Sequence, residues 1–160
     1  MAQLFAGDDY TEASAPPVHW PTLAAEDLAD QARGLYAWTV RLQHRFPEMV
    51  RLPACWYRHN SLVELLSALR DHERACYADT AAPTAAVTWM TAFRDIETRL
   101  RGWVAELRCG GDPRYHDLSV HAVASLEGTT PADLDAWIAD TIAARQLAAI
   151  HAAVGATGER

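Results

Sequence analysis

Two pairs of cysteine and histidine residues have the side chains best suited to chemistry in this sequence. Three residues lie between Cys55 and His59, and six residues lie between Cys109 and His116. Thiolate and imidazole groups are the usual ligands of a structural zinc ion, which binds four of them in a tetrahedron. Each pair lies beside the end of an expected helix, so the four side chains are suited to a zinc clip that ties two helix ends together.

A second interpretation of these pairs needs no metal. Cysteine is among the residue types most often buried, and Cys55 and Cys109 then act as small apolar side chains while the histidines bond nearby carbonyls. The two spacings also differ from those of the common zinc fingers. A third interpretation, a reactive thiol, fits Cys55 better because Arg58 and His59 are close to it in the sequence, whereas Cys109 follows a helix C-terminus. The sequence leaves these alternatives open.

Asp71, His72 and Glu73 have the composition of a proton-transfer cluster, but their spacing argues against that role. Consecutive positions of a helix point about 100° apart and cannot converge on one substrate. We therefore expect these residues to form a solvated helix face.

Composition and charge indicate the class of protein. The chain has 160 residues, half of them apolar, with six tryptophans and a formal net charge of −7. A chain of this length is expected to form one domain with a substantial core. Because the net charge is negative, nucleic acid is a poor default partner. A weaker hypothesis of a DNA-associated regulator requires four arginines to face one way, namely Arg94, Arg99, Arg101 and Arg108.

The sequence also predicts the compartment. The first residues include no basic segment of the kind that begins a secretory signal, and no run approaches the ~20 apolar residues that a membrane span needs. Three cysteines is an odd number, which disfavours a disulfide framework. We expect a cytoplasmic protein with reduced thiols and no membrane association.

Residues 1–19 mix acids, prolines and small polar side chains without periodicity, which predicts a flexible leader before a single helical domain over 20–160. The first helix is expected from Thr22, as its cap, to Phe46, because Pro47 disfavours helical geometry before it. Ser61 and Glu64 have the spacing of a capping box that begins a second helix. The expected buried stripes are Leu28, Leu35, Trp38, Leu42 and Phe46 in the first helix, and Leu62, Leu65, Leu66, Leu69 and Cys76 in the second.

Two more helices follow in the expected order. Thr84 begins a third helix that continues to Gly110 and Gly111, and its expected apolar set is Val87, Met90, Phe93, Ile96, Leu100, Trp103 and Leu107. Residues 117–127 fit both a strand and a short helix, and we favour helix or irregular structure because a single strand has nothing to pair with. Thr130 and Pro131 begin a fourth helix that runs to Val154 and ends at Gly155. Four helices without a repeat predict an all-α bundle.

One segment supports a resemblance to a known family. Cys55-Trp56 with His59 precedes a leucine-rich helix, and the wider pattern comprises Trp38, Leu42, Leu62, Val63, Leu66, Trp89, Phe93, Leu100 and Arg101. This pattern, over residues 30–116, resembles a group of small tryptophan-rich actinobacterial domains of unknown function. Members often lie on plasmids, conjugative elements and prophages. Since the family has no established activity, the resemblance implies a mobile-element setting rather than a mechanism.

Function is predicted mainly by what the sequence lacks. It has no glycine-rich phosphate loop, no GxSxG, no HExxH and no Glu-x-x-His pair. We therefore expect a non-catalytic accessory or adaptor protein that acts through protein contacts, with Trp56, Tyr57 and Trp20 as partly exposed interface anchors. The alternative is a small-ligand-binding protein or small enzyme with a pocket between helices, near Arg58, His59 and His116.

Overall fold

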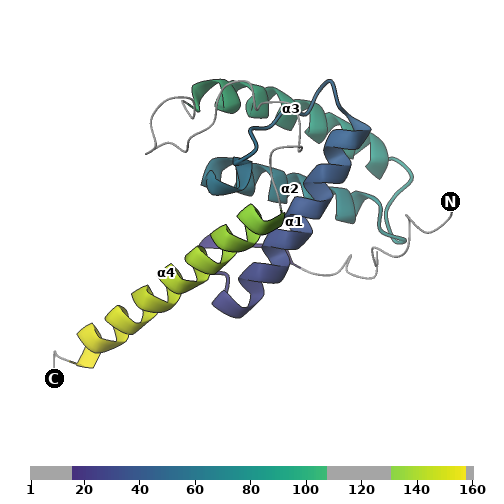
Figure 1. Cartoon of the computed structure of the whole chain (residues 1–160). Coiled ribbons are helices and arrows are strands. Elements are labelled where there is room, and N and C mark those ends of the chain that lie inside the picture. Colours follow the sequence, from purple (N-terminus) through teal and green to yellow (C-terminus); the bar gives the residue numbers. More distant parts are fainter. Residues whose placement is uncertain (1–15, 108–130, 158–160) are drawn as a thin grey trace, which may run out of the picture.

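The protein has an all-α fold, as expected from the sequence. The computed structural model describes residues 16–107 and 131–157, and within them it contains helices and no strand. The elements in chain order are η2 (Trp20–Thr22), α1 (Ala25–Arg45), η3 (Trp56–Arg58), α2 (Asn60–Cys76), α3 (Ala85–Glu106) and α4 (Pro131–Thr157). Figure 1 shows that the second half of α4 projects from the body formed by the other helices. Residues 1–15 of the expected leader and the ambiguous segment 117–127 lie outside the described residues.

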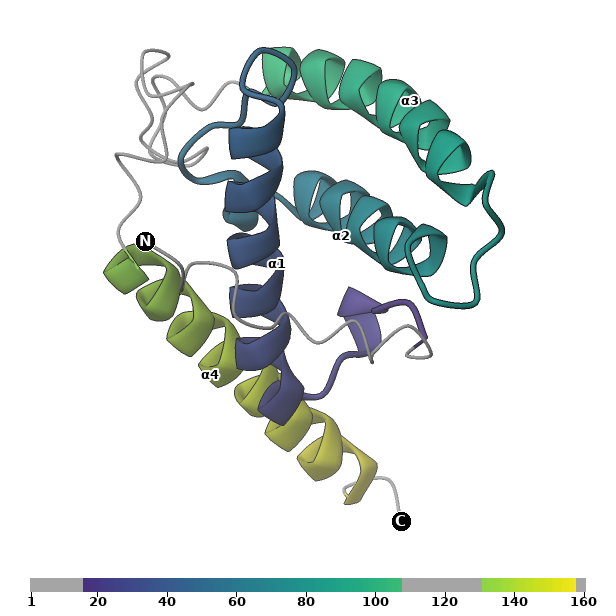
Figure 2. The same cartoon turned by 90° about the vertical axis from the view of Figure 1, so that its right-hand side faces the viewer.

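The helices pack in the order α4, α1, α2, α3 (Figure 2). The main contacts join α2 to α3, and α1 to both α4 and α2. The predicted stripes of α1 and α2 are confirmed in their central positions, because Leu28, Leu35 and Leu42 of α1 and Leu62 and Leu66 of α2 are at most 1% exposed. They belong to one core that includes residues from all four helices.

The starts of α1 and α2 differ from the expected ones. Thr22 does not cap α1, because Pro21 helps to form the 3₁₀ turn η2, and the Thr22 hydroxyl lies 2.7 Å from Nδ1 of His19 instead. The N-cap of α2 is His59, two residues before the expected Ser61, and it makes no side-chain capping bond. Here η3 leads directly into the helix, so the Ser61 capping box is not formed.

The expected apolar stripe of α3 is partly wrong. Trp89, Phe93 and Leu100 are buried, whereas Val87 and Met90 are 69% and 46% exposed. The rings of Trp89 and Phe93 stack with centroids 5.3 Å apart. Trp89 and Phe93 define the side of α3 that packs toward α2. Val87 and Met90, two or three positions away along the helix, therefore lie at the surface.

The ends of α3 and α4 also differ from the expected ones. α3 ends at Glu106, with Leu107 already in an extended conformation, rather than continuing to the double glycine, which lies outside the described residues. α4 passes through Gly155 to Thr157. Glycine weakens a helix by only about 1 kcal/mol, which does not end this alanine-rich helix. None of the described helices is long and apolar enough to cross a membrane.

Val18 lies against the helical body, although the sequence assigns it to the leader. The backbone N–H of Val18 donates a 3.1 Å hydrogen bond to Asp71 on α2, and the Val18 side chain packs against the core. The attachment to the body thus begins before residue 20.

Candidate functional site

Cys55 and His59 are brought together by the short turn η3. Cys55 is the residue before η3 and His59 the residue after it, and the backbone N–H of His59 donates to the carbonyl of Trp56 at 3.0 Å. This turn places Sγ of Cys55 3.2 Å from Nε2 of His59. The expected partners, Cys109 and His116, lie outside the described residues.

The geometry of this pair suits a zinc site, and it also suits a direct hydrogen bond between thiol and imidazole without a metal. Two zinc ligands at about 2.3 and 2.0 Å from the metal are about 3.5 Å apart in a tetrahedron, and a thiol–imidazole hydrogen bond has a similar length. Within residues 16–107 and 131–157, no group of three or more His, Cys, Asp and Glu side chains is placed to hold a metal ion. The described residues therefore supply half of the predicted zinc site.

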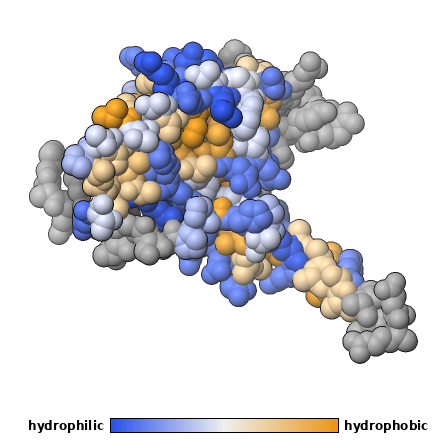
Figure 3. Space-filling model, turned by 180° about the vertical axis from the view of Figure 1, so that it is seen from behind, coloured by the Kyte–Doolittle hydropathy of each residue, from blue (hydrophilic) through white to orange (hydrophobic). Residues whose placement is uncertain are grey.

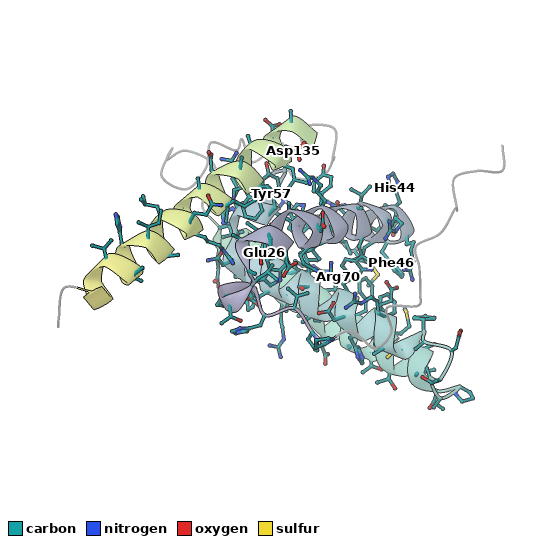
Figure 4. All side chains as sticks on the ribbon, turned by 90° about the horizontal axis from the view of Figure 1, so that it is seen from below. Glu26, His44, Phe46, Tyr57, Arg70 and Asp135 are labelled. Carbon is teal, nitrogen blue, oxygen red and sulfur yellow. The ribbon has the colours of Figure 1, made fainter. Side chains whose placement is uncertain are left out.

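The expected aromatic interface is wrong. Trp56, Tyr57 and Trp20 are only 2%, 4% and 6% exposed. The Trp56 ring stacks on Tyr36 of α1, and the Tyr57 ring meets Trp137 of α4 edge-on with centroids 5.5 Å apart. Figure 4 shows Tyr57 where the first half of α4 crosses the body. Helices distant in sequence cover these rings, so they anchor the core rather than a partner.

The acidic residues expected on a solvated face of α2, Asp71 and Glu73, are instead half-buried against neighbouring segments of the chain. The side chains of Asp71 and Glu73 are 9% and 13% exposed. Asp71 accepts from Arg74 at 3.0 Å and from the backbone of Val18, and it pairs with Arg70, which is itself buried. These charges stabilise the packing of α2, and they do not form an acid–base pair at a cavity.

The arginines of α3 do not form the single basic face that the DNA hypothesis requires. Arg94, Arg99 and Arg101 are all exposed, but at about 100° per residue Arg99 points away from the side that holds the other two. Arg101 pairs with Glu97 on its own helix. Arg108 lies outside the described residues.

A cavity of about 320 Å³ lies between η2, α1, α2 and α4. Its apolar lining includes Trp20, Val63 and Trp137, and its charged lining consists of Glu64 and Arg145. Arg145 donates to the backbone carbonyls of Leu23 and Trp20, and so holds α4 against the segment that precedes α1. Neither His59 nor Arg58 lines this cavity, and His116 lies outside the described residues. The pocket expected near these three residues therefore stays a prediction.

The projecting helix α4 has two apolar sides. Its inner side packs on α1 through Leu134 and Ile138, which are 4% and 3% exposed. At about 100° per residue, the opposite side is a continuous stripe of apolar residues. This outer face of α4 consists of Ala132, Ala136, Ala139, Ala143, Leu147, Ile150 and Val154, all exposed.

The outer face contains large apolar side chains in its second half. Leu147, Ile150 and Val154 are 54%, 58% and 65% exposed. Figure 3 shows the projecting end of α4 as mostly hydrophobic. No exposed apolar face was predicted for this helix from the sequence. The sequence does contain a signal for this face, because apolar residues occur on both sides of the expected helix.

Comparison of the chain with protein-family models, with curated proteins and with solved structures found no match. The resemblance to tryptophan-rich actinobacterial domains thus stays a prediction from the sequence.

Proposed function

We propose that the protein is a non-catalytic accessory or adaptor protein that acts through protein contacts made by the outer face of α4. The observation that carries this proposal is the exposure of Leu147, Ile150 and Val154, at more than half of each residue's surface. The mobile-element setting implied by the family resemblance is a separate prediction.

Exposed apolar surface of this kind favours association. Each Å² of apolar surface removed from water contributes about 25 cal/mol, so three large side chains on one stripe represent several kcal/mol of potential binding energy. A helix that is apolar on opposite sides belongs in an interior. Among the described residues, the inner side of α4 packs on α1, and Trp137 and Arg145 of α4 contact Tyr57 and Trp20. A protein partner would complete the burial.

Site-specific photo-crosslinking in the native host tests this proposal. A photoreactive amino acid at Ile150 is expected to give a covalent adduct of discrete mass, and a second substitution, Leu147→Glu, is expected to abolish it. The matched control carries the same photoreactive group at Met90, an exposed apolar residue of α3. If the probe at Ile150 gives no adduct beyond that of the control, the proposal is rejected.

The cavity supports a second candidate function, the binding of a small ligand. Its volume of about 320 Å³ is near the lower end of known ligand sites, about 300 Å³. The indole rings of Trp20 and Trp137 and the guanidinium of Arg145 suit a planar aromatic carboxylate. The hydrogen bonds of Arg145 to Leu23 and Trp20 use two of its N–H groups, and a guanidinium carries five.

Tryptophan fluorescence tests this second candidate with 2-naphthoate as the probe. Binding is expected to quench the indoles that line the cavity, and Glu64→Gln is expected to strengthen binding because it removes a like charge. Thr141→Phe, which fills the cavity from α4, is expected to abolish it. Quenching that Thr141→Phe leaves unchanged would place the probe elsewhere and reject the candidate.

A further inference from the structure

We infer that the partner of the outer face of α4 is a second copy of this chain, paired antiparallel about a two-fold axis at Ala143. This inference rests on the proposed function, because it names the partner of the same face. Three properties of the face carry it: the spacing of its residues, the distribution of large and small side chains, and the distribution of charge.

The spacing of the outer face is the same in both directions from Ala143. Successive members lie four, three and four residues apart on each side of it, which gives positions 132, 136, 139, 143, 147, 150 and 154. Such a repeat averages about 3.67 residues per turn, so the stripe stays nearly straight along the helix. In an antiparallel pair centred on Ala143, every member of one stripe therefore meets a member of the other.

The side-chain sizes are complementary in this arrangement. The stripe has only alanine before and at residue 143 and only large residues after it. Antiparallel pairing places Leu147 opposite Ala139 of the other copy, Ile150 opposite Ala136, and Val154 opposite Ala132. Large residues then fill the spaces above small ones along the whole contact, as in well-packed cores. In a parallel pair, large residues would meet large residues at one end of the contact and would crowd it. At the other end alanines would meet alanines and would leave gaps.

Charge favours the same orientation. The acidic residues of α4 are Asp133, Asp135 and Asp140, all in its first half, and residues 141–157 include no acid. Antiparallel pairing sets the acidic half of one helix beside the acid-free half of the other. This arrangement avoids direct repulsion between two copies that each carry a net charge of −7. The contact is also isologous, so it closes as a dimer without forming a filament.

The size of the contact predicts a dissociable dimer. From Ala132 to Val154 the stripe is about 33 Å long at about 1.5 Å per residue. A strip of this length between two helices buries roughly 500 Å² per copy, which is less than the about 800 Å² of a typical specific interface. The equilibrium between one and two chains should therefore be measurable by dilution.

Sedimentation equilibrium of the purified full chain tests the pairing. The mass is expected to rise from one chain to two across the micromolar range, and Ile150→Glu is expected to raise the dissociation constant by at least about tenfold. The control is Met90→Glu on α3, which removes an exposed apolar side chain of similar size and should leave the equilibrium unchanged. Circular dichroism checks that both variants remain helical.

Exchanging the large and the small side chain of one predicted contact tests the antiparallel orientation. Ala136→Leu and Ile150→Ala are each expected to weaken the dimer, the first by collision with Ile150 of the other copy and the second by lost burial. The double variant is expected to recover most of the affinity, because a large residue again meets a small one. Parallel pairing predicts no such recovery, since residues 136 and 150 would then face only themselves.

Cysteine cross-linking locates the axis. Ala143→Cys is expected to form a disulfide between copies, because the residue meets itself at the two-fold axis. Ala136→Cys should not, since the two copies of that residue lie about 21 Å apart in the antiparallel pair. Wild type controls for the three native cysteines.

The outcomes separate this inference from the proposed function. A wild type that stays monomeric at all concentrations, or a dimer that Ile150→Glu leaves intact, overturns the second copy as the partner. An adduct at twice the chain mass in the photo-crosslinking experiment supports both statements. An adduct of another mass supports the proposed function and rejects the second copy.

Discussion

The indole Nε1 of Trp38 donates a 2.6 Å hydrogen bond to Oε2 of Glu73, which joins α1 to α2. Arg45, also on α1, donates to Oε1 of the same carboxylate at 2.6 Å. Both oxygens of Glu73 thus accept hydrogen bonds from the neighbouring helix. A residue that the sequence places among solvated charges therefore connects two helices of the core.

Replacing Glu73 with alanine should destabilise the fold. The substitution leaves the Trp38 indole N–H without its acceptor in a residue that is only 7% exposed, and an unsatisfied buried donor costs about 1–3 kcal/mol. Chemical denaturation of the variant measures this loss. Glu48→Ala, at an exposed position, is the matched control and should change the free energy of unfolding by no more than about 0.5 kcal/mol. Equal effects in the two variants would show that the carboxylate of Glu73 does not stabilise the fold.

The zinc hypothesis predicts one zinc ion per chain in the purified protein. Elemental analysis measures it, and Cys55→Ser should remove the metal because serine does not replace a thiolate ligand. Cys76→Ser is the control, since Cys76 lies on the other end of α2, with Sγ 3.6 Å from Nε2 of His72, and should retain the zinc. A wild type that folds stably without any bound metal would reject the zinc site. The hydrogen bond between Cys55 and His59 would then be the interaction that this pair makes.

The aromatic cluster of α3 should be the most sensitive part of the core. Phe93 is fully buried, stacks on Trp89, and has its ring centroid 4.5 Å from that of Phe46. Phe93→Ala should therefore cost about 3–5 kcal/mol in the free energy of unfolding, because it leaves a cavity between three elements. Met90→Ala, one turn away and 46% exposed, should cost much less. Comparable losses in the two variants would contradict the finding that Phe93 lies on the buried side of α3 and Met90 on the exposed side.

Tyr36 should make stability fall at alkaline pH. Burial raises the pKa of the Tyr36 phenol above its ordinary value of 10.0, and Tyr57 and Asp133 raise it further by repelling the phenolate. Above pH 10 the unfolded chain then loses this proton before the folded chain does, so the free energy of unfolding decreases as the pH rises. Denaturation at a series of pH values should show this decrease in wild type and a smaller one in Tyr36→Phe. An identical pH dependence in the two proteins would exclude Tyr36 as its source.

The sequence predicted those features that depend on local patterns. The spacing of Leu28, Leu35 and Leu42 indicates a helix with one buried side, and Pro47 ends that helix near Phe46, as the structure confirms. The Cys55–His59 pair was also found from spacing alone, because η3 closes within five residues. Capping was predicted less well at Thr22 and Ser61, since a 3₁₀ turn competes with each cap for the same backbone groups.

What the sequence by itself determined is the fold class, the long helices of residues 16–107 and 131–157, and most of their inward stripes, because helical periodicity and proline act over a few residues. Only the tertiary structure decided which side chains are covered. Tyr36 and Trp137 bury Trp56 and Tyr57 from helices far along the chain, and α1 packs against one side of α4 and leaves the other side exposed. Burial depends on neighbours that are distant in sequence, so the exposed surface that a partner can bind appears only when the helices are packed together.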